Sequence, residues 1–266
     1  MPSLSRIKEI MKSNIESTWV SLKYNFRKRY IPGYVSFDSK RFYVADIPSV
    51  GAQIQEIYIH RFLEIPKQIG HGGLVIDCGA NVGISTAYYA EQHPNAKVIS
   101  YEADPDIFTY LQKNIESIGC KNIELIQKAV WINNEYIEFA QEGSASGSIF
   151  GQSNKIKVPC VRLKEVLQSH IHIDILKIDI EGAEFEVIRD CKDELHRADY
   201  IFLEYHSFSS QEQVLPELLS ILKSNQFKYF IQEAYVPKKP RFLWMATKHD
   251  MDLQLNIYAI KESLIQ

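Results

Sequence analysis

Short apolar runs separated by segments of helical periodicity fill most of the chain after residue 50. Each run is rich in Ile, Leu and Val, which is typical of strands buried in a parallel sheet with helices on both sides. We predict strands at 74–79, 97–104, 122–130, 173–179, 199–206, 228–236 and 253–261. Helices are predicted at 55–69, 82–92, 105–118, 162–170, 183–195 and 211–224. Because no convincing helix joins the last two runs, we expect a seven-stranded, mostly parallel α/β sheet with one antiparallel strand.

The region between the third strand and the next helix is less regular. Two extended pieces, 136–141 and 155–161, are joined by the Ser/Gly-rich segment "EGSASGSIFGQSN" at 142–154. Clusters of Ser and Gly between periodic segments are typical of loops. We expect residues 142–154 to form a mobile cover over the substrate.

The first 48 residues do not share the strand–helix alternation. Residues 3–29 carry apolar side chains at three-and-four spacing, which predicts a helix. Residues 34–46 predict a hairpin with Asp38 and Ser39 near its turn. We therefore divide the chain into an N-terminal extension, residues 1–48, and a main domain, residues 49–266.

The N-terminal helix is basic, because residues 1–31 contain seven Lys or Arg and two Glu. Three interpretations remain open. Its apolar face packs on the domain or on a second subunit, which would give a homodimer. Alternatively, the helix makes a peripheral contact with an anionic membrane surface, or it acts as a lid over the substrate.

Composition narrows the class of protein. The chain has 266 residues, is 45% hydrophobic and 24% charged, and carries a net charge of −3. These values indicate a soluble globular protein without a global attraction to nucleic acid. Its four cysteines show no CxxC pair, no apolar run approaches a bilayer span, and no secretory signal is evident. We expect reduced thiols and a cytoplasmic protein.

The stretch "LVIDCGANVGIST", starting at Leu74, places Asp77, Gly79, Asn81 and Gly83 directly after a buried strand. In open α/β sheets ligands bind beyond the carboxyl ends of the strands, where Gly79 and Gly83 permit a tight turn. Glu102 ends the next strand, where an acid commonly accepts hydrogen bonds from ribose hydroxyls.

The acid before the glycine turn indicates which ligand to expect. The nicotinamide motif G-x-G-x-x-G and the Walker lysine are absent, and Asp77 would repel a pyrophosphate. Asp77 would instead pair with a cationic, phosphate-free ligand, which favours S-adenosylmethionine (SAM). The alternative is that the glycines only tighten the turn and Glu102 is a solvated strand end.

Charged residues also follow the fourth and fifth strands. In "LKIDIEGAE", Lys177, Asp179 and Glu181 share one face at period two, and "FLEYH" places Glu204 and His206 two apart. Burying such charges is costly unless they are paired or used. We expect all five to converge on one cleft beside the SAM site.

Base-capable side chains beside an activated methyl donor predict methyl transfer to a hydroxyl oxygen. His206 is the first candidate base, because an unperturbed imidazole pKa of about 6.5 leaves it mostly neutral. Asp179 and Glu204 are the next candidates; Glu181 is expected to hold the turn or the acceptor, and Lys177 to neutralise the acids. Alternatively, Lys177 and Asp179 form a purely structural ion pair, and His206 is a core histidine.

Together, "VIDCGANVGISTAYYA", "YEADPDIFTYLQKNI", "NIELIQKAV", "LKIDIEGAEFEVI" and "FLEYH" resemble the FkbM-type SAM-dependent O-methyltransferases. The resemblance covers about Val75 to His206. It implies a seven-stranded, Rossmann-like class I methyltransferase fold and acceptors such as sugar or natural-product hydroxyls. It implies SAM contacts at Asp77, Gly79, Asn81, Gly83 and Glu102, with Ala129 and Val130 near the adenine, and it places Asp179, Glu181 and Gly182 in the cleft. It does not settle which residue is the base.

Other functions remain as alternatives. One is an RNA or DNA methyltransferase. Against it, the Asp/Asn-Pro-Pro-aromatic run common in amino-methylating enzymes is absent after the fourth strand, and the SAM domain is acidic. A non-catalytic SAM-binding module and a nicotinamide oxidoreductase are the other candidates. We expect no metal, although a metal-assisted reaction using Asp179, Glu181, Glu204 and His206 stays open.

Overall fold

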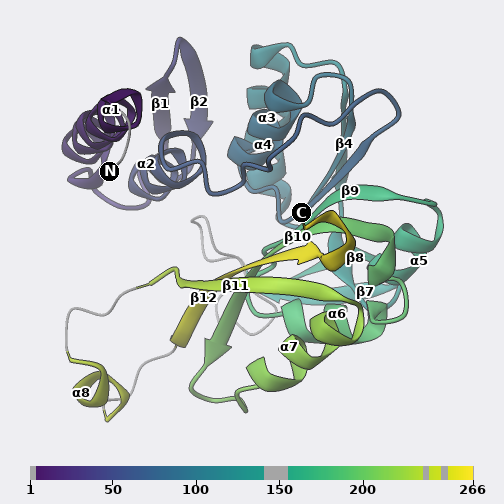
Figure 1. Cartoon of the computed structure of the whole chain (residues 1–266). Helices are drawn as coiled ribbons and strands as arrows, with labels where there is room; N and C mark the ends of the chain where they lie inside the picture. Colours follow the sequence, from purple (N-terminus) through teal and green to yellow (C-terminus); the bar gives the residue numbers. More distant parts are fainter. Residues whose placement is uncertain (1–3, 141–154, 236–239, 247–250, 266) are drawn as a thin grey trace.

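The computed structural model describes residues 4–140, 155–235, 240–246 and 251–265. The main sheet has seven strands in the order β11-β12-β10-β9-β3-β4-β5 (Figure 1). The strands are β3 (Leu74–Cys78), β4 (Lys97–Glu102), β5 (Ile123–Gln127), β9 (Ile173–Ile178), β10 (Ala198–Phe208), β11 (Phe227–Glu233) and β12 (Met251–Lys261).

The directions of the strands confirm the predicted sheet. From β10 across β9, β3 and β4 to β5, all neighbours are parallel. Strand β12 runs antiparallel to both of its neighbours, β10 and β11. The chain places β4 on one side of β3 and β9 on the other, so the carboxyl ends of β3 and β9 border a crevice suited to ligand binding.

Helices cover both faces of the sheet (Figure 1). Val75 and Ile175 pack in one apolar cluster, whereas the adjacent Ile76 and Leu176 pack in a second, because side chains alternate along a strand. The first cluster takes in α3 (Ile84–Gln92) and α4 (Pro105–Ile118). The second takes in α5 (Leu163–Gln168), α6 (Glu184–Cys191) and α7 (Leu215–Ser224).

The structure differs from the prediction at three places. The expected strand 122–130 is interrupted at Lys128, whose N–H bonds to the Ile126 carbonyl at 3.0 Å, and it continues as β6 (Ala129–Trp131). Strand β6 joins a second sheet in the order β6-β8-β7, with β7 at Tyr136–Ala140 and β8 at Lys155–Arg162. Residues 142–154, the expected cover, lie outside the described residues.

The other two differences concern helices. The predicted helix 55–69 begins earlier, as α2 (Ile47–Ile54), because Pro48 suits a first helical turn. It continues as a π-helical turn, Gln55–Ile59, and ends there. A short helix that we did not predict, α8 (Arg241–Met245), lies between β11 and β12.

The predicted hairpin is present as β1 (Gly33–Phe37) and β2 (Lys40–Val44), with Asp38 and Ser39 in the left-handed region. Asn114 of α4 ties it to the domain. Its amide accepts from the Tyr43 N–H at 2.7 Å and donates to the carbonyls of Tyr43 and Val82 at 2.9 and 2.8 Å. The hairpin is therefore fastened to the loop that carries the glycine turn.

Helix α1 (Leu4–Val20), which runs on into a π-helical turn at Ser21–Asn25, contacts the domain differently from our expectation. Ser17 and Ser21 donate to the Gln55 side chain at 2.9 and 3.0 Å. The predicted apolar positions Ile15, Trp19 and Leu22 are instead 61%, 67% and 65% exposed. These three residues therefore do not pack on the domain, whereas Val20 and Tyr24 of the same segment are buried in its core.

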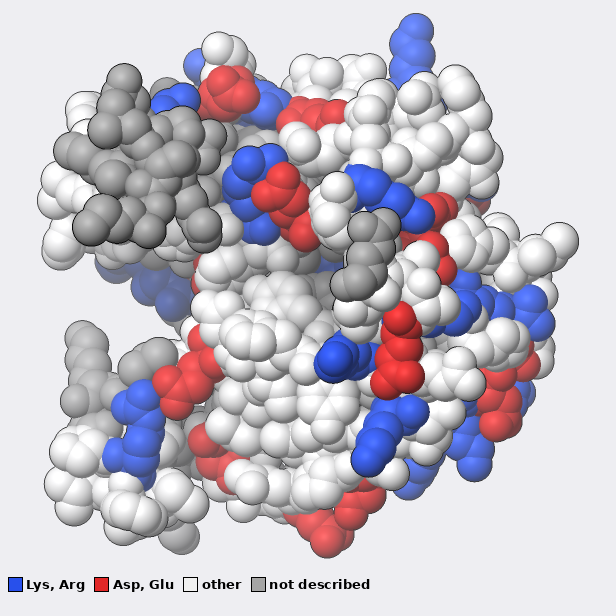
Figure 2. All heavy atoms as spheres, in the orientation of Figure 1, with Lys and Arg blue, Asp and Glu red and all other residues white. Residues whose placement is uncertain are grey.

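Surface charge on the face seen in Figure 2 is mixed, with Lys/Arg and Asp/Glu interspersed. Among the described residues, no helix is both long and apolar enough to cross a bilayer.

Candidate active site

A cavity of about 230 Å³ lies at the carboxyl ends of β3, β4, β9 and β10. The expected site residues Gly79, Asn81, Glu102, Ala129, Val130, Lys177, Asp179, Glu181 and Glu204 all line it. Asp77, Gly83 and His206 do not. The structure thus brings most of the expected residues together around one space.

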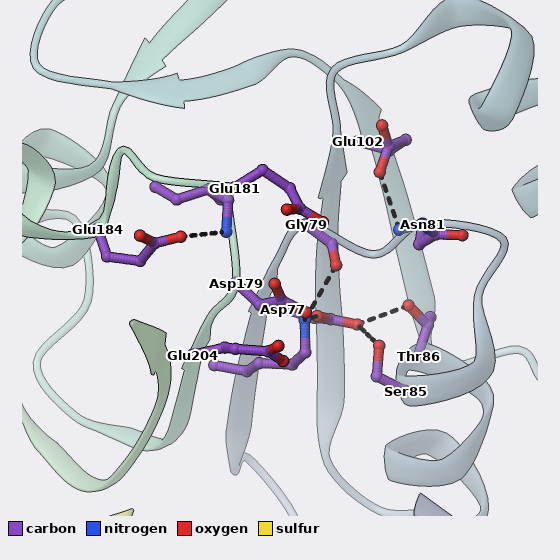
Figure 3. A network of polar contacts seen from close by, with 12 residues as sticks. Asp77, Gly79, Asn81, Ser85, Thr86, Glu102, Asp179, Glu181, Glu184 and Glu204 are labelled. Atoms are coloured by element: carbon purple, nitrogen blue, oxygen red, sulfur yellow. Dashed lines mark hydrogen bonds and ion pairs between the residues drawn. The ribbon is translucent and has the colours of Figure 1, made fainter. Parts of the chain in front are cut away.

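Glu102 forms one end of the cavity. Its carboxylate accepts a hydrogen bond from the Asn81 N–H at 2.8 Å (Figure 3) and another from the Asp104 N–H at 2.9 Å. Burial nevertheless raises the pKa of Glu102 to about 7. The neighbouring wall is largely apolar and consists of Ile107, Ala129, Val130 and Phe139. This end combines a hydrogen-bond acceptor with a surface suited to a flat ring.

The glycine turn packs directly against the end of β9. Gly79 has φ +83°, and a Cβ atom there would lie 1.7 Å from the Asp179 carbonyl oxygen, so only glycine fits. Gly83 has φ +94° and contacts α4, where a Cβ atom would lie 2.7 Å from Leu111 Cδ1. Gly83 therefore allows α4 to pack closely, and it is not among the residues that line the cavity.

Asp77 lies beneath the cavity and is fully buried. Its carboxylate accepts from the Ser85 and Thr86 hydroxyls, both at 2.8 Å, and pairs with Lys177 Nζ at 3.2 Å (Figure 3). The expectation that Asp77 pairs directly with a cationic ligand is therefore not met, because its charge is already balanced within the protein.

Lys177 links the two strands that border the crevice. Its ammonium contacts Asp77 and Asp179, the latter at 3.4 Å, and donates to the Gly79 carbonyl at 2.9 Å. Burial by itself lowers the pKa of Lys177, but the two carboxylates raise it by more, so this pKa lies above its ordinary value. The ion pair that we considered as an alternative is present.

Acidic side chains crowd the other end of the cavity. Asp179, Glu181 and Glu204 face it, as does Glu56 from the π-helical turn after α2. Burial raises the pKa of Glu204 and of Glu56 to about 7, and that of Glu181 to about 8. Asp179 adds to the rise at each of them, because like charges disfavour ionisation.

His206 stands behind this acidic end, with 6% of its surface exposed. Its Nδ1 contacts Glu184 at 3.2 Å, and its Nε2 lies 3.6 Å from both Glu181 and Glu204. Burial by itself lowers the pKa of His206, but Glu184 and Glu181 raise it by more, to well above the ordinary 6.5. The expectation started from an unperturbed imidazole, whereas the ring of His206 is enclosed by three carboxylates.

Among the residues missed in the sequence are four polar ones at the acidic end. Glu56, Gln254 and Asn256 line the cavity from elements distant in the chain, and nothing local indicated them. Glu184 did carry a signal, since an acid in the first turn of a helix binds free N–H groups. It is fully buried and accepts from the Ile180 and Gly182 N–H groups, each at 3.0 Å.

We predict that Lys177→Met lowers the free energy of unfolding by about 3–5 kcal/mol, because two carboxylates lose their buried counter-ion. Lys97→Met is the matched control, since Lys97 is half exposed in its pair with Glu124 and should cost less than about 1 kcal/mol. Denaturant titration measures both. Equal effects of the two substitutions would contradict the role given to Lys177.

Comparisons with known proteins indicate the family of the chain. The sequence profile described as "Methyltransferase FkbM domain" matches residues 77–229. Methyltransferase sdnD of Sordaria araneosa is 24% identical over 204 residues, which cover 61% of this chain and 77% of that protein. The 2-O-methyltransferase NoeI of Sinorhizobium fredii is 26% identical over 178 residues, covering 57% and 71%.

Among solved structures, a putative transferase from Pyrococcus horikoshii gives a TM-score of 0.49 at 12% identity, covering 87% of this chain and 73% of that one. Because this TM-score is below 0.5, we base the assignment on the strand order and on the profile, which spans more than half of the chain. The chain belongs to the FkbM methyltransferase family, and its sheet is that of a Rossmann-like class I methyltransferase.

Proposed function

We propose that this enzyme transfers a methyl group from SAM to a hydroxyl of a glycan or natural product. The observation that supports this most is the convergence of Asp179, Glu181 and Glu204 on one end of the cavity. Carboxylates accept hydrogen bonds from hydroxyl groups, and they disfavour phosphate-rich partners such as nucleic acid. The similarity to a protein named a 2-O-methyltransferase supports oxygen as the acceptor atom.

The residues around Glu102 fit a SAM molecule. The Glu102 carboxylate is placed to accept from ribose hydroxyls, and Ala129, Val130 and Ile107 offer an apolar wall to an adenine. Asn81 holds the Glu102 carboxylate in place through its N–H. When bound, SAM supplies a methyl group that its sulfonium has already activated.

Glu204 is the base that the geometry favours. It lines the cavity, its carboxylate accepts from the Gln254 amide, and no lysine or arginine pairs with it among the described residues. Asp179 is already paired with Lys177, and His206 lies off the cavity wall. With SAM bound, methyl transfer to a hydroxyl oxygen would release the hydroxyl proton, and Glu204 is placed to take it.

SAM affinity should rise with pH through about 7. The pKa of Glu102 is raised to about 7, so the side chain is mostly ionised, and able to accept hydrogen bonds from ribose with both oxygens, only above that pH. Below it, we expect the dissociation constant to increase by up to about tenfold per pH unit. Calorimetry with Glu102→Gln should show weaker and pH-independent binding, with Glu124→Gln, an exposed acid on the neighbouring strand, as control. A Glu102→Gln variant that keeps the pH dependence would contradict this assignment.

Glu204→Gln should lower turnover by about 10²–10⁴-fold, as expected for loss of a general base, with SAM affinity retained. The measurement is methyl incorporation from labelled SAM into a panel of sugars and hydroxylated natural products. Glu233→Gln, outside the cavity on β11, is the control. Normal turnover by Glu204→Gln would indicate that Asp179 is the base instead. The absence of any methylated hydroxyl acceptor would refute the proposed function.

We further propose that the N-terminal helix contacts an anionic membrane surface. Ile15, Trp19, Leu22 and Phe26 follow one another at helical spacing and are each more than 60% exposed. Helix α1 lies at the outer edge of the molecule (Figure 1). The basic residues Lys12, Lys23, Arg27 and Lys28 are exposed around them. An apolar stripe bordered by Lys and Arg is the pattern of helices that bind in the lipid headgroup region.

Co-sedimentation with vesicles containing phosphatidylserine tests this contact. The double substitution Trp19→Ser/Phe26→Ser should weaken vesicle binding at least tenfold, because two large apolar side chains leave the lipid. Ile171→Ser, at a side chain 95% exposed elsewhere, should have no effect. If the full chain ignores the vesicles, and the double substitution instead dissociates a homodimer in sedimentation velocity, the stripe is a subunit interface and the membrane proposal fails.

A further inference from the structure

A divalent cation is the ligand that the acidic end of the cavity is best arranged to bind. Carboxylate oxygens of Asp179 and Glu181 and a ring nitrogen of His206 all lie within 4.8 Å of one another. Oxygen and imidazole ligands converging at such distances suit first-row divalent ions such as Mn²⁺. We propose that these three residues hold a divalent cation beside the acceptor, a role that rests on the proposed methyl transfer to a hydroxyl.

The orientation of His206 is the first argument. Glu184 is fully buried and fixed by two backbone N–H groups, and it receives the Nδ1 hydrogen of His206. Metal-binding histidines are commonly held in this way by a carboxylate on the second nitrogen. Nε2 then points toward Glu181 and Glu204, each 3.6 Å away. The amide nitrogen of Gln254 lies 3.3 Å from His206 Nε2, and it also donates a hydrogen bond to Glu204.

Asn256 provides an independent observation. It is 3% exposed, lines the same cavity, and its Oδ1 has no hydrogen-bond partner among the described residues. It is the cross-strand partner of Glu204 on β12, so the two side chains share one face of the sheet. A buried amide oxygen without a donor is costly, whereas such an oxygen is a normal ligand of a hard cation or of its bound water.

The balance of charge points the same way. Six acids line the cavity (Glu56, Glu102, Asp104, Asp179, Glu181 and Glu204), against two lysines, Lys128 and Lys177. Lys177 is already shared between Asp77 and Asp179. A divalent ion at the acidic end would offset two of these charges. It would also polarise an acceptor hydroxyl bound beside it, while Glu204 stays outside the ligand set to take the proton.

The test is Mn²⁺ binding by the full-length protein, measured by loss of the free Mn²⁺ signal in electron paramagnetic resonance. We expect one ion per chain, and at least tenfold weaker binding by Glu181→Gln and by Glu184→Gln. The control is Asp199→Asn. Asp199 belongs to a separate group with His172 and Asp174 near the start of β9 and β10, and this substitution should leave the affinity unchanged.

Two results would overturn the inference: no binding at millimolar Mn²⁺, or binding that Asp199→Asn abolishes and Glu181→Gln does not. The proposed function is judged separately. Methyl transfer to a hydroxyl that persists after chelation, with no Mn²⁺ binding, would refute the cation site and leave the methyltransferase proposal intact. Mn²⁺ binding without any methylated hydroxyl acceptor would support the cation site and refute methyl transfer to a hydroxyl.

Discussion

The contact between the glycine turn after β3 and the end of β9 is the constraint on which the site depends. Gly79 lies so close to the Asp179 carbonyl that no side chain fits between them, and Lys177 bonds the Gly79 carbonyl at 2.9 Å. The same ammonium pairs with Asp77 under one strand and Asp179 beyond the other. The turn near Glu102 and the acidic end of the cavity are therefore held as one unit, because neither strand end can move without breaking a buried ion pair.

This arrangement explains why so many acids are tolerated in one place. Those near the turn are satisfied within the protein, as Asp77 is by two hydroxyls and Lys177, and Glu184 by backbone N–H groups and His206. At the cavity wall, Asp179 pairs with Lys177, whereas burial raises the pKa of Glu181 and Glu204. The acids thus divide into Asp77 and Glu184, which lie off the cavity and are held by protein groups, and the acids that line it.

The sequence predicted the ends of β3 and β9 to within one residue, because periodicity and the glycine turn are local signals. It could not predict which charged side chains pair, since that depends on registers such as Asp77 beside Lys177 across β3 and β9. From the sequence we expected Asp77 to contact the ligand, whereas in the structure it pairs with Lys177. We expected His206 to be a free base, whereas carboxylates enclose it. Asn256 was out of reach for the same reason, because only the pairing of β12 with β10 places it beside Glu204.

The carboxylates around His206 limit what its second ring nitrogen can bind. With Nδ1 tied to Glu184, the second nitrogen faces acceptors rather than the cavity, so a proton or a metal ion is the natural occupant of the space between them. A proton there makes His206 a fixed cation that offsets Glu181 and Glu204. The divalent cation that we propose would take the place of that proton, with Asp179, Glu181 and His206 as its ligands. In either case His206 contributes positive charge beside Glu181 and Glu204.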